Sequence, residues 1–191
     1  MRFSTLSSGS KANVSFIEIG ETRILIDVGL SCRETEKRLI NIGIAPDSIN
    51  AIMVTHEHSD HIRGISRFSL RNKVPVWTTE KTKNFFPDVY GLEIFKSGSI
   101  FSLDSTVTIR AFPIPHDAVD PVGFCLKGKN FKFGYATDLG KVTPVVEDAL
   151  QGCDAAVIES NHEEDLLWSC HYPWELKQRI ASNYGHLSNS M

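Results

Sequence analysis

The strongest constraint on the fold is a pattern that recurs along the chain: a short apolar segment that ends in a reactive side chain. The largely apolar run INAIMV leads directly into the polar segment THEHSDH, at residues 55–61. Loops at strand ends of α/β folds converge on one edge and collect the catalytic residues there. We therefore expect an α/β fold with its chemistry at strand ends. The polar residues that follow apolar runs are Asp27, His56, His116, Asp138 and Glu159.

The segments between these positions predict β-hairpins and strands with interspersed helices. Apolar β-rich runs joined by short turns predict one hairpin over residues 13–29 and a second over residues 122–138. Single strands are expected at residues 74–79, 105–116 and 154–160. Helical spacing predicts helices over residues 32–44 with a glycine stop, from about Asp60 to residue 72, and over residues 174–185.

Length and composition favour a single domain, residues 1–191, in the cytoplasm. A chain of 191 residues that is 41% hydrophobic can bury one core. Four scattered cysteines without a C-x-x-C pair favour reduced thiols. No run resembles a signal peptide or approaches a membrane span of ~20 apolar residues. The net charge of -3 disfavours a wholly basic surface but allows a local groove. The lysines considered for it are Lys127, Lys129 and Lys132.

The histidine cluster itself indicates a metal centre. In an extended H-x-H segment both side chains project to the same side, so His56 and His58 can share one ion. A helix beginning at Asp60 turns Asp60 and His61 back toward the same space, which suggests a second ion nearby. Imidazole and carboxylate ligands suit zinc, manganese or iron. The alternative is a surface loop in which Ser59 or Asp60 caps a helix.

With these ligand types in this order, the sequence resembles the metallo-β-lactamase fold superfamily of metallohydrolases. The resemblance implies an αββα sandwich and two divalent ions. It assigns four residues to one ion and three to the other, with Asp138 shared by both. It also gives Asp27 a structural role beside the site. The alternative for Asp27 is an ordinary aspartate in a turn. The first set is His56, His58, His116 (in PIPHD) and Asp138 (in ATDLG), and the second is Asp60, His61 and Asp138.

Further motifs resemble the bacterial YycJ/WalJ exonuclease-like branch of that superfamily. They are SSGSKAN, ESNHEEDLL, YPWELKQRI and GHLSN, and they extend the resemblance from Ser7 to Asn189. In related enzymes the histidine of a GHLS-like motif assists as a proton donor at the leaving group, which implies this role for His186. The alternative is a histidine in a terminal tail.

The sequence departs from that resemblance at its end. Such enzymes place a further histidine of the second metal site well beyond the GHLS-like motif, whereas this sequence stops five residues after His186. We therefore expect the sandwich to be C-terminally incomplete, the second ion to bind more weakly, and a homo-oligomer to cover an exposed face. His162 and His171 are the remaining histidines inside the sequence; we expect His162 to shape the site and not to replace the ligand.

These observations predict a metal-dependent hydrolase that uses a dinuclear, metal-activated water. Asp60 and Asp138 would orient the water, and no G-x-S-x-G elbow or P-loop is present. A phosphodiesterase acting on DNA is the first hypothesis. A thioester or lactone hydrolase with the same metal core is the second, and a metal-poor form that only binds is the third. No membrane partner is expected.

Overall fold

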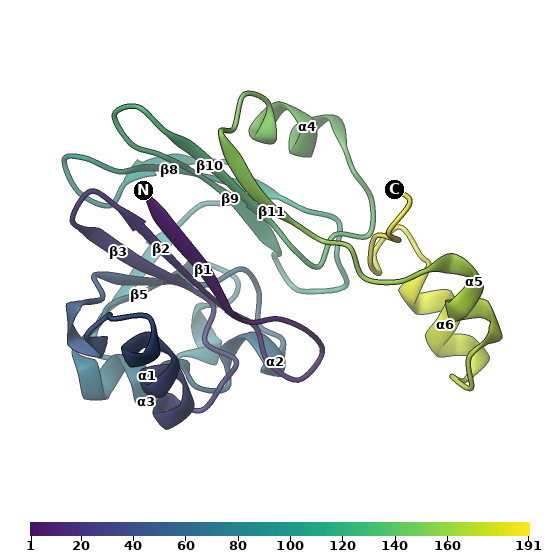
Figure 1. The fold of residues 1–191 in the computed structure, drawn as a ribbon, viewed down its shortest axis with the longest axis horizontal. Coiled ribbons are helices and arrows are strands. Elements are labelled where there is room, and N and C mark those ends of the chain that lie inside the picture. The colour runs from purple at the N-terminus through teal and green to yellow at the C-terminus, as the bar shows by residue number, and fades with distance from the viewer. The chain divides into compact units, whose positions relative to one another are not determined.

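A computed structural model describes all 191 residues, and its internal packing divides them into two compact units (Figure 1). The N-terminal unit comprises residues 1–96 together with 101–107. The C-terminal unit comprises residues 97–100 together with 108–191. Each unit is built on one β-sheet with helices, which confirms the expected α/β class. That all of these residues form one domain stays a prediction.

The N-terminal unit contains a six-stranded mixed sheet with strand order β1-β2-β3-β4-β5-β6. The first three strands pair antiparallel, and β3 to β6 run parallel to one another. Strands β1 and β6 were not predicted; their exposed residues hide the apolar alternation by which strands are recognised. The strands are β1 (Arg2–Ser7), β2 (Val14–Ile19), β3 (Thr22–Ile26), β4 (Ala51–Met53), β5 (Val76–Thr79) and β6 (Leu92–Phe95).

The first predicted hairpin is confirmed as the β2–β3 pair. Ile17 lies opposite Ile24 in the ladder, and Gly20 makes the turn with a φ of 62°. A positive φ is easily reached only by glycine, which explains the position of this residue between two β-branched runs. The end of β3 is thereby fixed, and Asp27 follows it directly.

Three α-helices and two 3-10 turns accompany this sheet. The Ser31 hydroxyl caps the first helix by accepting the Glu34 amide, 3.3 Å away, and Gly43 ends that helix with a φ of 76°. The helices are α1 (Cys32–Asn41), α2 (Ser59–Ile62) and α3 (Ile65–Asn72), and the 3-10 turns are η1 (Pro46–Ser48) and η2 (Lys83–Phe85).

The expectation of one continuous helix from Asp60 was wrong in one respect, because the helix is interrupted at Gly64. The Gly64 amide donates to the Val28 carbonyl at 2.8 Å. A Cβ atom at this glycine would lie 1.9 Å from the Leu30 carbonyl oxygen, so only glycine allows this approach. The break separates the short helix that carries Asp60 and His61 from the helix that packs in the core.

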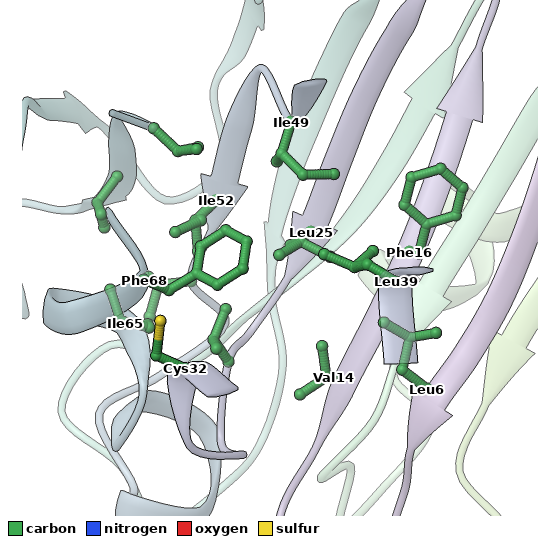
Figure 2. Close-up of a cluster of buried hydrophobic side chains, with 14 of the residues drawn as sticks. Leu6, Val14, Phe16, Leu25, Cys32, Leu39, Ile49, Ile52, Ile65 and Phe68 are labelled. Atoms are coloured by element: carbon green, nitrogen blue, oxygen red, sulfur yellow. The ribbon is translucent and has the colours of Figure 1, made fainter. Parts of the chain in front are cut away.

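The core of the N-terminal unit lies between its sheet and helices α1 and α3 (Figure 2). Phe16 and Leu25 project from β2 and β3, and Leu39 and Phe68 meet them from the two helices. All four side chains are fully buried. Burial of this apolar surface, worth ~25 cal/mol per Å², anchors the strands whose ends carry the histidine cluster.

The C-terminal unit contains a five-stranded sheet with strand order β11-β10-β9-β8-β7. Strands β8 to β10 pair antiparallel, which confirms the second predicted hairpin, and β11 runs parallel to β10. Strand β7 lies where the two units divide the chain. The strands are β7 (Ile100–Ser102), β8 (Thr108–Pro113), β9 (Val122–Lys127), β10 (Lys132–Ala136) and β11 (Ala155–Ile158).

Helices α4 (Pro144–Leu150), α5 (Glu164–Ser169) and α6 (Trp174–Ile180) complete this unit. Helix α4 covers β8, β9 and β10, as Figure 1 shows. Its Val146 and Ala149 pack in a second core with Phe112 and Leu187. The last helix was predicted over residues 174–185 and ends at Ile180, whereas α4 and α5 were not predicted. No helix of either unit has the length and apolar character that crossing a membrane requires.

Replacing Phe68 by alanine should strongly destabilise the N-terminal unit. The side chain is fully buried among the helices and the sheet, so its loss leaves a cavity that costs ~3–5 kcal/mol. Denaturant unfolding followed by circular dichroism measures this change. The matched control is Leu70→Ala on the same helix; Leu70 is 52% exposed, and this variant should change stability by less than ~0.5 kcal/mol. Equal effects of the two variants would contradict the assigned core.

Candidate metal centre

Two aspartates at strand ends adopt backbone conformations that non-glycine residues rarely use. Asp27 follows β3 and Asp138 lies two residues after β10, with φ values of 58° and 56°. Such conformations cost free energy and persist where the surrounding structure requires them, which is often at functional sites. Both residues belong to the strand-end pattern found in the sequence.

The Asp27 carboxylate organises the histidine cluster of the N-terminal unit. It is fully buried and accepts hydrogen bonds from the Thr55 amide at 2.9 Å and the Thr55 hydroxyl at 2.7 Å. The His61 Nδ1 lies 2.8 Å from the same carboxylate. A carboxylate only accepts, so this contact places the His61 proton on Nδ1 and leaves a lone pair on Nε2.

The same reasoning fixes the ring of His56. The Thr55 hydroxyl has one proton and donates it to Asp27, so its oxygen accepts from His56 Nδ1, 3.0 Å away. The Nε2 of His56 therefore carries a lone pair, and it lies 3.0 Å from Nδ1 of His58. Thr55 was not predicted as part of the site, although it is the first residue of the THEHSDH segment.

The second predicted pair, Asp60 and His61, is held by a side chain that sequence reasoning missed. The Asn13 amide lies 3.1 Å from the Asp60 carboxylate and 3.0 Å from His61 Nε2. The Asp60 carboxylate is itself 3.5 Å from that nitrogen. Asn13 belongs to the SSGSKAN motif, so the motif was noticed but its contact with the aspartate and histidine was not.

Gly29 lets the loop that carries Asn13 approach the histidine segment. The Gly29 amide donates to the Asn13 carbonyl at 2.9 Å, and the Asn13 amide donates to the Asp60 carbonyl at 2.8 Å. A Cβ atom at Gly29 would lie 1.6 Å from the Asp60 carbonyl oxygen. Any side chain at this position would therefore displace the segment that carries Asp60.

The C-terminal unit contains a group of His116, Asp138, Glu159 and His186. The His186 Nδ1 lies 2.7 Å from the Glu159 carboxylate and 3.5 Å from the Asp138 carboxylate. The rings of His116 and His186 have centroids 5.3 Å apart. His116 is buried; its Nδ1 donates to the Gly185 carbonyl at 3.2 Å, and its Nε2 lies 3.4 Å from the Asp117 carboxylate.

Glu159 holds this group together and was named only as a strand-end residue. Besides the His186 contact, it accepts the Leu139 amide at 2.6 Å and the Leu187 amide at 3.3 Å. It therefore connects the loop after Asp138 to the GHLSN segment. One carboxylate oxygen each of Glu159 and Asp138 and one ring nitrogen of His186 all lie within 4.8 Å of one another.

The two histidines of this group experience opposite electrostatic environments. Burial lowers the pKa of His116 by more than the nearby Asp138 and Asp117 raise it. Burial acts in the same direction on His186, but the hydrogen bond and charge of Glu159, with Asp138 and Asp117, raise its pKa above the ordinary value. The surroundings therefore favour the neutral form of His116 and the protonated form of His186, relative to an ordinary histidine.

The residues of the cluster fit a bound metal ion. Two nitrogens on one tetrahedral zinc, each ~2.05 Å from it, lie roughly 3.3 Å apart. The 3.0 Å between His56 Nε2 and His58 Nδ1 is close to this value, and the Thr55 contact leaves the former nitrogen unprotonated. Outer ring nitrogens held by carboxylates or hydroxyls are typical of metal-binding histidines.

Other predicted residues lie away from these groups. His171 is exposed in the turn between α5 and α6. Lys127 and Lys132 face each other at the turn of the β9–β10 hairpin, and the Lys132 ammonium donates to the Gln151 carbonyl. Asp138 follows the opposite end of β10, roughly 20 Å from that turn at ~3.3 Å per residue. The three lysines therefore do not line the aspartate's end of the hairpin.

The fold and the site together define the class of protein. Residues 22–188 match the Beta-lactamase superfamily domain, and the chain belongs to this family. It is a hydrolase of the metallo-β-lactamase fold, and this fold implies divalent metal ions.

Relatives and solved structures agree with this assignment. The chain is 34% identical to Exodeoxyribonuclease YycJ of Bacillus anthracis, over 99% of this chain and 74% of that protein. It is 34% identical to Exodeoxyribonuclease WalJ of Streptococcus pneumoniae serotype 2, over 98% and 72%. Zn²⁺-bound PqqB from Methylobacterium extorquens has a similar fold, with a TM-score of 0.69 and 14% identity over 92% of this chain and 68% of that one. The predicted resemblance to the YycJ/WalJ branch is confirmed.

Replacing Asp27 by asparagine should weaken metal binding without unfolding the chain. The amide keeps the shape of the carboxylate but can no longer accept from every donor around it, so His61 and Thr55 lose their fixed orientation. Loss of such a supporting contact lowers metal affinity by ~10–100-fold. Calorimetric titration of zinc into the apo protein measures the affinity, with exposed Asp47→Asn as the matched control. Wild-type affinity in Asp27→Asn would show that the carboxylate does not orient the ligands.

Proposed function

We propose that the chain is a phosphodiesterase that hydrolyses DNA with two divalent ions, zinc or manganese, with iron also compatible. Asp138 would be shared by the two ions. The observation that carries the proposal is the His186–Glu159 pair beside Asp138, because it supplies a proton next to a metal ligand. The ligands are His56, His58, His116 and Asp138 for one ion and Asp60, His61 and Asp138 for the other.

Phosphodiester hydrolysis requires more than an activated water, because the leaving nucleoside oxygen is a poor leaving group unless it is protonated. When bound, two such ions lower the pKa of a water and take up negative charge on phosphate oxygens. Lactones and thioesters do not need an equally strong proton donor, so a dedicated Glu159–His186 pair favours the phosphodiester. The names of the two exodeoxyribonucleases, similar along nearly the whole chain, support the same substrate class.

In the proposed reaction, His186 is the general acid. Its Nδ1 is engaged by Glu159, so Nε2 is the atom that faces away from that contact and holds the transferable proton. Water adds to phosphorus, the bond between phosphorus and the leaving oxygen breaks, and that oxygen takes the Nε2 proton. Solvent returns a proton to His186 after each turnover. Asp60, held by Asn13, and Asp138 orient the attacking water.

The direct test compares chelator-treated and metal-supplemented protein on several substrates. We expect metal-dependent cleavage of single- and double-stranded DNA and of bis(p-nitrophenyl) phosphate, and weaker DNA binding as salt increases. Turnover of a thioester or lactone without any cleavage of DNA would overturn the proposal in favour of a small-molecule hydrolase. Absence of bound metal and of all turnover would favour a chain that only binds.

Replacing Asp138 by asparagine or Asp60 by alanine should remove phosphodiesterase activity and leave the fold intact. Both side chains lie outside the hydrophobic cores, so stability should change little. The expected decrease in kcat is roughly 10²-fold or more, the size seen when a charge-stabilising group is lost from an active site. Steady-state kinetics and circular dichroism measure the two properties. The control is Asp148→Asn, an exposed aspartate that pairs with Arg110 on the surface. Wild-type rates in metal-loaded Asp138→Asn would refute the two-ion mechanism.

Replacing His186 by alanine should affect substrates according to their leaving groups. On DNA, loss of a general acid should lower kcat by ~10²–10⁴-fold. On bis(p-nitrophenyl) phosphate the decrease should be much smaller, because p-nitrophenolate departs without a proton. Glu159→Gln should show the same pattern with a smaller amplitude, since it only loosens the orientation of His186. An equal decrease on both substrates would instead indicate a structural role for His186.

Titrating metal into the apo protein should reveal one tight and one loose step. The proposed first site has four ligands, whereas the second has Asp60, His61 and the shared Asp138. Fewer ligands and one shared charge reduce the affinity of the second ion. Calorimetry with zinc and with manganese measures both steps, and Asp60→Ala should remove only the loose one. Two steps of equal affinity would contradict the proposed division of ligands.

A further inference from the structure

A cavity of about 550 Å³ lies in the C-terminal unit beside His186, and the proposed hydrolytic centre does not use it. His162, Trp168 and Leu187 form part of its wall, and His186 and Lys141 also line it. The size falls within the range of ~300–1,000 Å³ that is typical of small-molecule sites. A cavity adjacent to the proposed general acid can therefore hold a part of the substrate next to the reacting bond.

The walls of the cavity suit a flat, uncharged group better than a phosphate. Trp168 presents an aromatic surface and is 43% exposed, so its ring is open to stacking. The Trp168 ring packs at a tilt against the Trp174 ring, with centroids 5.5 Å apart. Lys141 is the one lysine or arginine in the lining, and Glu164 also lines the cavity. An anion would be attracted by Lys141 but repelled by Glu164, whereas an uncharged aromatic ring could stack on Trp168.

One polar group in the wall has no partner. The Nδ1 of His162 is buried and makes no hydrogen bond. This nitrogen has almost no accessible surface, so other atoms of His162 form the cavity wall. The backbone of His162 is fixed by a bridge to Ser188, and its carbonyl accepts the Asn189 amide at 2.8 Å. The ring is therefore attached to the GHLSN segment that carries His186.

We propose that this cavity is a nucleobase subsite, in which one base of the DNA substrate stacks on Trp168 beside the His162 side of the wall. The inference rests on the proposed function and specifies how the same site holds its substrate. Stacking on an aromatic side chain tolerates every base, which fits a nuclease without sequence preference. The subsite fixes one nucleotide next to the phosphodiester that His186 protonates.

The kinetic test uses a set of DNA oligonucleotides, each with one abasic residue. The position of that residue differs from one oligonucleotide to the next, counted from either end of the strand. In the wild-type protein, one abasic position should raise KM by about 5- to 150-fold, which corresponds to ~1–3 kcal/mol of base stacking. Trp168→Ala should raise KM on the intact strand by a similar factor and remove the sensitivity to that position. Trp168→Phe should retain most of the sensitivity.

Tyr172→Ala is the matched control, because Tyr172 is an equally exposed aromatic residue between α5 and α6 that does not line the cavity. It should leave KM and the abasic profile unchanged. The same abasic profile in Trp168→Ala and in the wild type would overturn the inference. Wild-type protein that fails to cleave any DNA would instead count against the proposed function.

A binding measurement tests the base subsite independently of the proposed nuclease activity. Thymidine 5′-monophosphate added to the metal-free protein should shift the indole N–H resonance of Trp168, and Trp168→Ala should weaken its binding by at least 5-fold. Deoxyribose 5-phosphate, which lacks the base, should bind at least 5-fold more weakly than the nucleotide. Equal binding of both compounds, or no binding of the nucleotide, would overturn the base subsite whether or not the protein cleaves DNA.

Discussion

The buried carboxylate of Asp27 is the interaction on which the N-terminal half of the site depends. It lies at the end of β3, and the segment after β4 reaches it through the Thr55 amide and hydroxyl and through His61. A buried charge without partners would cost several kcal/mol, so these donors and the carboxylate require one another. The requirement extends to the backbone, because Asp27 adopts a left-handed φ of 58° to present its side chain. The contacts of Asp27 therefore join the end of β3 to the segment after β4 and orient His61.

The sequence predicted the ligand types better than their supports. The H-x-H-x-D-H spacing and the apolar run before it placed His56, His58 and His61 at a strand end, because strand periodicity and burial are local properties. Asn13 was not predicted, because its contacts with Asp60 and His61 join residues 47 and 48 positions apart. Contacts of this range depend on the pairing of β2, β3 and β4, which no local pattern specifies.

The same distinction explains the errors in secondary structure. Both hairpins were predicted because short turns and β-branched runs are local signals, whereas β6 was missed because most of its residues are exposed. The interruption of the helix at Gly64 was missed for a tertiary reason, since the Val28 and Leu30 carbonyls occupy the space where a side chain would be. Gly64 is required by its packing against the loop after β3, and this contact cannot be recognised from the helical pattern alone.

Each of the two units contains a histidine whose Nδ1 pairs with a carboxylate at a strand end, but the two histidines have different surroundings. In each, a carboxylate at the end of a strand accepts backbone amides from another segment and the Nδ1 of a histidine: Asp27 with His61, and Glu159 with His186. His61 is fully buried, and its Nε2 contacts the Asn13 amide at 3.0 Å and lies 3.5 Å from the Asp60 carboxylate. His186 lines a cavity, and Glu159, Asp138 and Asp117 raise its pKa. The two histidines therefore differ in burial and in the groups around the second ring nitrogen, although both pair with a carboxylate through Nδ1. These differences fit the proposed roles of His61 as a metal ligand and of His186 as a general acid.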